Sequence, residues 1–467
     1  MASVRISRTP SSGGNRKTFT FSAWIKRGDL EETTQTLLMS GDDNGNNNIS
    51  VLHLKDNQLE FYTWVGGYQH QVTTTRVFKD TTAWYHIVVA VDTTQSTASD
   101  RVKMYVNGSQ ETSFANSSYM SQNYDTFINH TVLHGIANYN AGTSQYFDGC
   151  MAHIHLTDGT AYAASDFGES DSVSGIWKPK TAPSVTHGTN GFFLKFENSG
   201  NLDLDSSTNN HTFTTSGTLT QNVDTPSNNF CVLNFLDRAR TATNNLGDAL
   251  ENANTTFNTS NAVKATARGT IGVQAGKWYW EAKYNGGTAW ATGICLEELL
   301  ADNTAQFWDS SSILAVAING GSGTLYVNGR SSDSWNTGVS FSSGDIFGFA
   351  LDVDNQALYI HRNGTYLTAN SNVGNPTSGS SRTGSVLGEL TTGGYQNYIP
   401  DGKYVFPFCQ DVSTGASTTI YMNFGNGRFG TTALASSNSD SAGLGLFEYS
   451  VPSGYYSLCT KNIKDYG

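Results

Sequence analysis

Residues 84–108, WYHIVVAVDTTQSTASDRVKMYVNG, are the stretch that decides the fold class of this chain. An apolar run ends at Asp92 and is followed by a polar connection. In the next run, residues 102–106, apolar and polar side chains alternate, which is the two-residue period of a half-buried strand. The closing Asn107-Gly108 supplies the positive φ angles that a two-residue hairpin turn needs. The stretch therefore predicts two antiparallel strands.

The same pattern returns much later in the chain, at residues 344–364, GDIFGFALDVDNQALYIHRNG. From Phe347 to Val353, phenylalanine, leucine and valine alternate with smaller or polar residues, and Asn363-Gly364 closes the stretch. Two copies of one hairpin pattern predict an all-β protein, with two antiparallel β-sandwiches in series.

The composition agrees with this fold class. The chain has 467 residues, which fits two or three domains of ordinary size. Its 48 glycines and its 12% aromatic residues favour short strands joined by tight turns. Charged residues make up only 14%, so long solvated helices are not expected.

The net charge of −12 argues against a protein that binds the phosphate backbone of nucleic acid. No run of apolar residues is long enough for a membrane span, and the first residues have no apolar core of a secretory signal. We therefore expect folding in a cytoplasm, without membrane insertion. The five cysteines form no CxxC pair, so we expect them to be reduced.

Four segments, taken in order, carry a family resemblance: TFTFSAWIK at 18–26, WYHIVVAVD at 84–92, VKMYVNG at 102–108 and YFDGCMAHIH at 146–155. Their succession resembles the laminin-G-like branch of the concanavalin A-like sandwiches. The resemblance implies a jelly roll, and we assign the first domain to residues 1–165. It leaves the function open, since this fold carries lectins, adhesion modules and glycanases alike.

The next segment resembles a connector of tailed-bacteriophage structural proteins, in which it follows a laminin-G-like domain. The motifs that carry this resemblance are FGE and WKP within residues 165–180 and VDTPSN at 223–228. We assign residues 166–260 to this connector. It includes a strand at residues 191–196 that is expected to return to the first sandwich.

The remaining chain resembles a SPRY domain. The motifs are KWYWE at 277–281, the hairpin at 344–364, YVFPF at 404–408 and NFG at 423–425. The resemblance implies a second sandwich, SPRY-like with a C-terminal extension, over residues 261–467. In SPRY domains the loops at one end of the sandwich recognise partners.

Glycanases on the concanavalin fold place two glutamates on one strand face, two or four residues apart. No such run occurs here, and the adjacent pairs Glu31-Glu32 and Glu297-Glu298 would face opposite sides of a strand. We therefore expect no enzymatic activity.

No cofactor is expected apart from calcium, for which the sequence offers a candidate site. Some laminin-G-like modules bind Ca²⁺ at the rim through aspartates, for which Asp42, Asp43 and Asp148 are the candidates. The alternative is that these aspartates only form or cap turns. His153 and His155 would share one face of a strand and could share a metal, although a hydrogen-bonded histidine pair is the favoured interpretation.

Ligand binding is expected from aromatic residues. Trp24, Trp64 and Tyr68 could stack on sugar rings, although most tryptophans of a sandwich serve in packing. In the SPRY-like part the corresponding loops are 285–290, 297–312, 331–339 and the long polar stretch 368–398. The candidates there are Trp290, Trp308 and Trp335.

We therefore expect a non-enzymatic virion protein of a tailed phage, assembled in the host cytoplasm. The favoured role is a tail fibre or similar appendage that binds host-surface glycans or receptors and contacts other virion proteins. A homo-oligomer, for example a trimer, fits such an appendage. The alternative is a head-decorating or head-fibre protein docked on the capsid. A third interpretation, less favoured, is a glycan-degrading enzyme.

Overall fold

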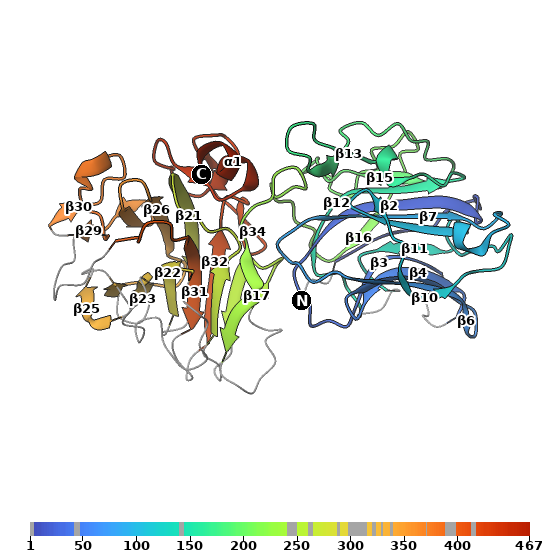
Figure 1. Ribbon diagram of the computed structural model, residues 1–467, viewed down its shortest axis with the longest axis horizontal. Helices are drawn as coiled ribbons and strands as arrows, with labels where there is room; N and C mark the ends of the chain where they lie inside the picture. Colours follow the sequence, from blue (N-terminus) through green and yellow to red (C-terminus); the bar gives the residue numbers. More distant parts are fainter. Residues whose placement is uncertain are drawn as a thin grey trace. The chain divides into compact units, whose positions relative to one another are not determined.

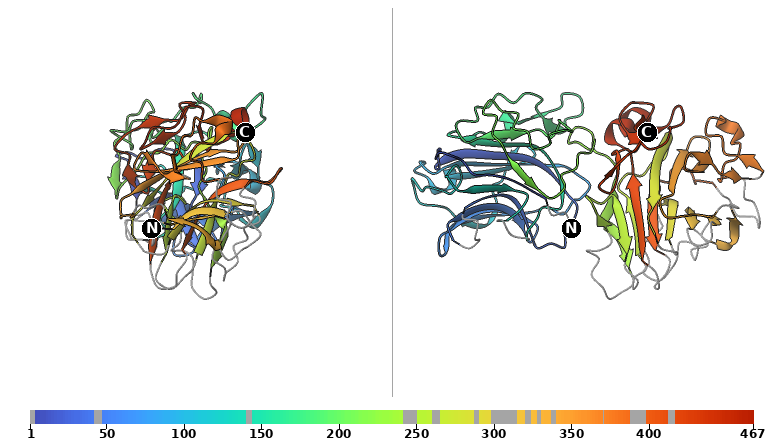
Figure 2. Two further views of the ribbon diagram at one scale, coloured as in Figure 1. Left: turned by 90° about the vertical axis from the view of Figure 1, so that its left-hand side faces the viewer. Right: turned by 180° about the vertical axis from the view of Figure 1, so that it is seen from behind.

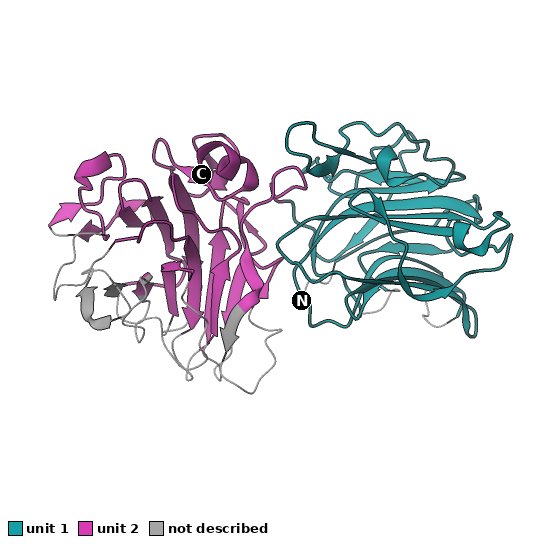
Figure 3. Cartoon of the chain, viewed as in Figure 1, with its two compact units in different colours: residues 1–221 teal, residues 222–467 magenta. Residues whose placement is uncertain are grey.

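The computed structural model describes residues 4–41, 47–139, 144–240, 250–259, 265–286, 290–297, 315–319, 324–327, 330–336, 340–369, 371–387, 398–411 and 417–467. The chain forms two compact units, Met1–Gln221 and Asn222–Gly467 (Figure 3). Residues 166–221 of the connector region thus lie in the first unit, and residues 222–260 lie in the second.

The first unit is a sandwich of two antiparallel sheets (Figure 1). One has the order β10-β6-β5-β4-β3-β11-β1-β16 and the other the order β15-β12-β2-β7-β8-β9. The strands are β1 (Arg5–Arg8), β2 (Thr18–Arg27), β3 (Thr34–Gly41), β4 (Ile49–Lys55), β5 (Gln58–Trp64), β6 (Tyr68–Val77), β7 (Tyr85–Asp92), β8 (Val102–Val106), β9 (Ser109–Gln110), β10 (Phe114–Ser118), β11 (Leu133–Ile136), β12 (Gly149–Asp158), β15 (Phe192–Leu194) and β16 (Thr214–Ser216).

The core of this unit lies between the two sheets and follows from the alternation in the sequence. Phe19 and Phe21 of β2 point into it together with Met104 of β8. The opposite face of the second sheet is also covered. Residues 160–185, here called the covering segment, pack on it with the buried side chains of Ala164 and Phe167. The covering segment includes η2 (Ala164–Asp166) and the hairpin of β13 (Gly168–Ser170) and β14 (Trp177–Pro179).

The first Asn-Gly pair forms the predicted turn, between β8 and β9. Asn107 and Gly108 have φ angles of 48° and 84°, and Val106 pairs with Ser109 across them. The side-chain oxygen of Asn107 also accepts a hydrogen bond of 2.8 Å from the backbone N–H of His86. The turn is therefore tied to the start of β7.

The second unit has two further antiparallel sheets, seen from behind in Figure 2. Their orders are β17-β20-β31-β22-β23-β24-β25 and β18-β19-β32-β21-β26-β27-β28, and β37 pairs with β21 in parallel. The strands are β17 (Leu233–Arg240), β18 (Leu250–Glu251), β19 (Thr256–Thr259), β20 (Ala265–Gly269), β21 (Lys277–Tyr284), β22 (Trp290–Leu296), β23 (Ala315–Asn319), β24 (Thr324–Val327), β25 (Arg330–Asn336), β26 (Ile346–Asp352), β27 (Ala357–Arg362), β28 (Thr365–Tyr366), β31 (Val405–Asp411), β32 (Thr418–Asn423) and β37 (Tyr456–Ser457).

Short elements complete the described structure. They are η1 (Ala98–Asp100), β29 (Thr368–Ala369), β30 (Asn372–Val373), η5 (Gly379–Ser381), β33 (Arg428–Phe429), β34 (Thr432–Ala433), β35 (Asn438–Ser439), β36 (Leu446–Phe447) and the helix α1 (Thr460–Tyr466). Within the described residues, no helix has the length and apolar character needed to cross a membrane. The prediction of an all-β chain built from antiparallel sandwiches is confirmed.

Residues 435–467, here called the tail, pack on one face of the second unit. Phe447 and Tyr455 of the tail are buried against Tyr279 of β21 and Tyr359 of β27. Strand β26 is consequently buried on both faces. The tail also pairs with the beginning of the unit, since Phe230 forms a β-bridge with Cys459.

Candidate functional site

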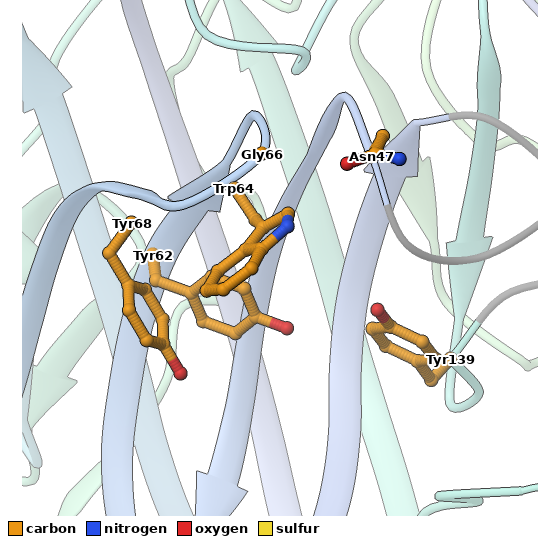
Figure 4. A pocket seen from close by; sticks show the side chains of 6 residues that line it. All are labelled: Asn47, Tyr62, Trp64, Gly66, Tyr68 and Tyr139. Atoms are coloured by element: carbon orange, nitrogen blue, oxygen red, sulfur yellow. The ribbon is translucent and has the colours of Figure 1, made fainter.

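A depression lies on the outer face of the first sheet of the first unit, where β5 turns into β6 (Figure 4). Its volume is about 460 Å³. The described residues that line it are Asn47, Tyr62, Trp64, Gly66, Tyr68 and Tyr139. Aromatic rings thus form most of its wall.

The aromatic wall follows from strand geometry. Tyr62 and Trp64 are two residues apart on β5 and therefore point to the same face. Trp64 pairs with Tyr68 across the hairpin, and Gly66 at the turn has a φ of 63°. The ring centroids of Trp64 and Tyr68 are 4.8 Å apart with an interplanar angle of 85°, and those of Tyr62 and Tyr68 are 5.4 Å apart at 76°. Edge-to-face contacts of this kind hold the rings in place.

A buried apolar cluster lies behind the aromatic wall. Met39, Ile49 and Val51 are buried on this outer face, and Trp64 and Tyr139 pack against them. Tyr62 and Tyr139 share a side-chain hydrogen bond, and burial raises the pKa of Tyr62 well above its usual value. Tyr62 is thus a neutral, fixed part of the wall.

The rim of the depression is open to solvent. Tyr68 is 49% exposed and Trp64 is half-buried, so both can offer ring surface to a ligand. The side chain of Asn47 lies on the other side of the depression from Tyr68 (Figure 4). Aromatic faces combined with a few polar groups suit a ligand that has an apolar face and hydroxyl groups, such as a sugar ring.

A buried carboxylate stands beside the aromatic wall. Glu60 precedes Tyr62 by two residues on the same face of β5 and is only 2% exposed. Its oxygens accept hydrogen bonds from His53 Nε2 at 3.0 Å, Thr73 Oγ1 at 2.7 Å and Gln71 Nε2 at 2.8 Å. Burial favours the protonated acid, but these donors outweigh it and lower the pKa of Glu60 to about 2. Glu60 is therefore ionised at neutral pH.

Of the aromatic residues predicted to bind ligands, the structure brings Trp64 and Tyr68 together at this depression. Trp24 lies on the other sheet, in β2, and is 2% exposed. Its indole stacks on His86, with centroids 4.6 Å apart and an interplanar angle of 13°. Trp290 is fully buried in β22 and stacks on Tyr284. Neither of these two rings has a free face for a ligand.

The remaining predicted residues are spread over the chain. Trp308, Asp42 and Asp43 lie outside the described residues, and Trp335 belongs to β25, where only the backbone is described. The calcium site involving Asp42, Asp43 and Asp148 therefore stays a prediction.

Asp148 lies near the other end of β4 and β5 from the depression. Its backbone carbonyl accepts a hydrogen bond of 2.9 Å from Gly28, and its charge acts on Arg27. Arg27 in turn donates a hydrogen bond of 2.7 Å to Asn57, at the turn between β4 and β5.

His153 and His155 do not form a regular pair on one strand face. The pairing of β12 with β2 shifts between Ala152 and His155, and His153 has a φ of 47°. His155 instead lies beside His187, with Nδ1 and Nε2 3.3 Å apart. In the described parts of the chain, no cluster of three or more His, Cys, Asp or Glu side chains could hold a metal ion.

Four lining residues were not predicted as site residues. Tyr62 had a sequence signal, because it lies two residues before Trp64 in the alternating run FYTW. Asn47 and Gly66 are in turns, where the sequence gives no orientation. Tyr139 follows β11 and reaches the depression only because β11 pairs with β3 in the folded sheet.

Residues 3–164 match the laminin-G-type family model of the concanavalin A-like lectin/glucanases superfamily. This match supports the concanavalin A-like fold that the sequence resemblance implied for this part of the chain. The fold name itself covers both lectins and glucanases, so it does not decide between binding and hydrolysis. A search of curated proteins found no match to the chain.

Solved structures similar to the chain include the SPRY domain of human HERC1, at 16% identity and a TM-score of 0.24, covering 34% of this chain and 81% of that one. Domain 4 of the arabinanase AbnA from Geobacillus stearothermophilus has 16% identity and a TM-score of 0.24, covering 32% and 64%. A SAP-like pentraxin from Limulus polyphemus has 15% identity and a TM-score of 0.26, covering 34% and 78%.

Proposed function

We propose that the protein binds glycans without cleaving them, through the depression formed by Tyr62, Trp64, Tyr68 and Tyr139. The observation that carries this proposal is the partly exposed pair of Trp64 and Tyr68, whose rings are in edge-to-face contact, with Trp64 packed against a buried apolar cluster. Exposed aromatic rings cost free energy in contact with water, and stacking on the apolar face of a sugar ring lowers that cost.

The chemistry of Glu60 favours binding over hydrolysis. Glycosidases need a carboxylic acid with a raised pKa that can donate a proton, together with a second carboxylate. The pKa of Glu60 is lowered to about 2, so it holds no proton to donate at neutral pH. The three hydrogen bonds that Glu60 accepts are consistent with a role in stabilising the sheet and in setting the local charge.

A serine–histidine pair elsewhere in the unit also fits a structural role. Ser22 Oγ and His86 Nε2 are 2.9 Å apart, but both residues are fully buried. The other imidazole nitrogen of His86 accepts a hydrogen bond from Trp177, where a catalytic triad would have a carboxylate. A substrate has no access to this serine.

The biological setting we propose is the virion of a tailed phage, with the protein as a tail fibre or similar appendage that attaches to host-surface glycans. The support is the motif set at residues 165–180 and 223–228, which resembles phage structural proteins. A shallow site binds weakly, so a homo-oligomer with several depressions would gain strength by multivalency. In the alternative proposal, a head-fibre or head-decorating protein on the capsid would bind glycans through the same depression.

Glycan binding is tested by titrating the full chain against an array of bacterial surface polysaccharides. We expect Trp64→Ala and Tyr68→Ala to weaken binding about fivefold to tenfold, as expected for the loss of an aromatic contact. Tyr404→Ala is the matched control, because Tyr404 is 41% exposed in the second unit. Equal binding by all four proteins, or binding by none, would refute the proposal.

Two further experiments separate the alternatives. A reducing-sugar assay on the polysaccharide that binds decides between a lectin and a glycanase. Immunogold labelling of phage particles decides between tail and head. Repeating the titration with a calcium chelator tests whether binding needs the predicted Ca²⁺ site.

A further inference from the structure

We propose that the depression selects glycans that carry a positively charged nitrogen, such as amino sugars, over neutral and acidic glycans. This inference rests on the proposed glycan binding and adds the charge of the ligand to it. It follows from the electrostatics of the described lining residues and of the strands beneath them.

The first contribution comes from the rings themselves. An aromatic ring carries negative charge density on its faces and attracts a cation that lies over them. Trp64 and Tyr68 are nearly perpendicular, at 85°, so their faces point in different directions around the depression. Tyr139 adds a ring on the opposite side (Figure 4). A cationic group in this space would meet more than one ring.

The second contribution is the charge of Glu60. This ionised carboxylate precedes Tyr62 by two residues, about 7 Å along β5. The negative charge of Glu60 acts on Tyr62, because it contributes to the raised pKa of the Tyr62 hydroxyl. A buried charge is screened less than one in water, so its field reaches a ligand that lies on Tyr62.

The described side chains that hydrogen-bond to Glu60 are those of His53, Thr73 and Gln71. Its partner His53 donates from Nε2, whereas Nδ1 of the same ring is buried and has no hydrogen-bond partner among the described residues. Among the described residues, no lysine or arginine hydrogen-bonds to Glu60.

The arginine of strand β6, Arg76, is occupied elsewhere. The described lining of the depression contains no lysine or arginine. Arg76 is near the far end of β6, where it forms an ion pair of 2.7 Å with Glu111. Eight residues separate Arg76 from Tyr68 along the strand, or about 26 Å. An acidic sugar would thus lie on aromatic faces close to the buried carboxylate of Glu60, with no lysine or arginine in the described lining.

The experiment compares trisaccharides that differ in charge. Binding of the full chain to chitosan trisaccharide, cellotriose and a trisaccharide of glucuronic acid is measured by calorimetry at about pH 6, where a sugar amine is protonated. The proteins are the wild type, Glu60→Gln and Trp64→Ala. Glu111→Gln is the matched control, because it removes the same charge from a carboxylate far from the depression.

We expect the chitosan trisaccharide to bind about fivefold to tenfold more tightly than cellotriose, and the acidic trisaccharide to bind most weakly. Glu60→Gln should reduce this preference while retaining cellotriose binding, and Glu111→Gln should leave it unchanged. Trp64→Ala should weaken all binding.

Equal binding of the three sugars by the wild type, with loss in Trp64→Ala, would overturn the charge inference and leave glycan binding intact. An undiminished preference in Glu60→Gln would also overturn it. Failure of every sugar on both the array and the calorimeter would refute glycan binding itself. If Glu60→Gln does not fold, the relative affinities of the wild type for the three trisaccharides still test the charge inference.

Discussion

The carboxylate of Glu281, on β21, accepts a hydrogen bond of 2.9 Å from the backbone N–H of Tyr449 in the tail. The hydroxyl of Tyr279 donates to the same oxygen, Oε1, at 3.1 Å, and the other oxygen, Oε2, accepts a hydrogen bond of 2.9 Å from the backbone N–H of Glu448. Glu281 is fully buried. One carboxylate therefore fastens the tail to the sheet.

This arrangement predicts a pH-dependent stability. Burial raises the pKa of Glu281 from 4.5 to about 7, although the backbone donors of Glu448 and Tyr449 act in the opposite direction. Between these values the folded state binds more protons than the unfolded chain, so the free energy of unfolding falls as pH rises from about 4.5 to about 7. We expect Glu281 to contribute a fall of roughly 3 kcal/mol.

Urea unfolding of the wild type and of Glu281→Gln at about pH 4.5 and about pH 8 measures this contribution, because the variant cannot ionise at this position. The stability of the wild type relative to the variant should decrease with pH. A difference that stays constant from acid to alkaline pH would mean that Glu281 titrates alike in both states.

Glu60 should show the opposite pH dependence. Its pKa falls from 4.5 to about 2 in the folded state, because the hydrogen bonds from His53, Thr73 and Gln71 outweigh burial. Its stabilisation is present above about pH 4.5 and is lost as the pH falls toward 2. We expect this stabilisation to be about 3 kcal/mol.

Acid titration of the wild type and Glu60→Gln, followed by tryptophan fluorescence, measures this effect. The wild type should lose stability steeply below about pH 4.5, and the variant more gradually. Coincident acid transitions would show that the three hydrogen bonds do not favour the ionised carboxylate.

Trp177 should hold the covering segment on the second sheet. Its Nε1–H donates a hydrogen bond of 3.0 Å to Nδ1 of the buried His86. Its ring also fills the space next to Gly108 and Gly168, where an added Cβ would come within 2.8 Å and 2.5 Å of the ring. We expect Trp177→Ala to cost about 3 kcal/mol and Trp177→Phe, which keeps a ring but loses the donor, about 1 kcal/mol.

A double-mutant cycle with Gly168→Ala tests the ring contact. Gly168→Ala alone should lower the melting temperature, because the added methyl group collides with the indole of Trp177. In the Trp177→Ala background the collision partner is absent, so the same change should cost much less. If the destabilisations caused by Gly168→Ala and Trp177→Ala are strictly additive, the indole of Trp177 does not pack against Gly168.

Turn chemistry made the hairpins predictable. Asn107 and Asn363 both adopt positive φ angles ahead of a glycine, at 48° and 49°. The side chains of both asparagines accept a hydrogen bond of 2.8 Å from the start of a neighbouring strand, from His86 and Ile346 respectively. Such local interactions depend on few residues, so the sequence pattern was sufficient to predict them.

Exposure was harder to predict, because it depends on segments far away in the sequence. The alternation around Trp24 indicates which face it shares, but not that the covering segment buries that face. Tyr139 shows the converse case, since only the pairing of β11 with β3 brings it to the depression. The irregularity of β12 at His153 likewise means that His153 and His155 do not share one face of a regular strand, although their spacing in the sequence predicts that they do.

The pairing of the two ends of the second unit has a consequence for how the chain can be rearranged. Cys231 N–H donates to the carbonyl of Leu458 at 2.8 Å, and Thr460 N–H donates to that of Asn229 at 2.9 Å. The polypeptide thus enters and leaves this unit at one place. A sandwich whose two ends lie side by side can be inserted into another chain, exchanged or circularly permuted without disrupting its sheets.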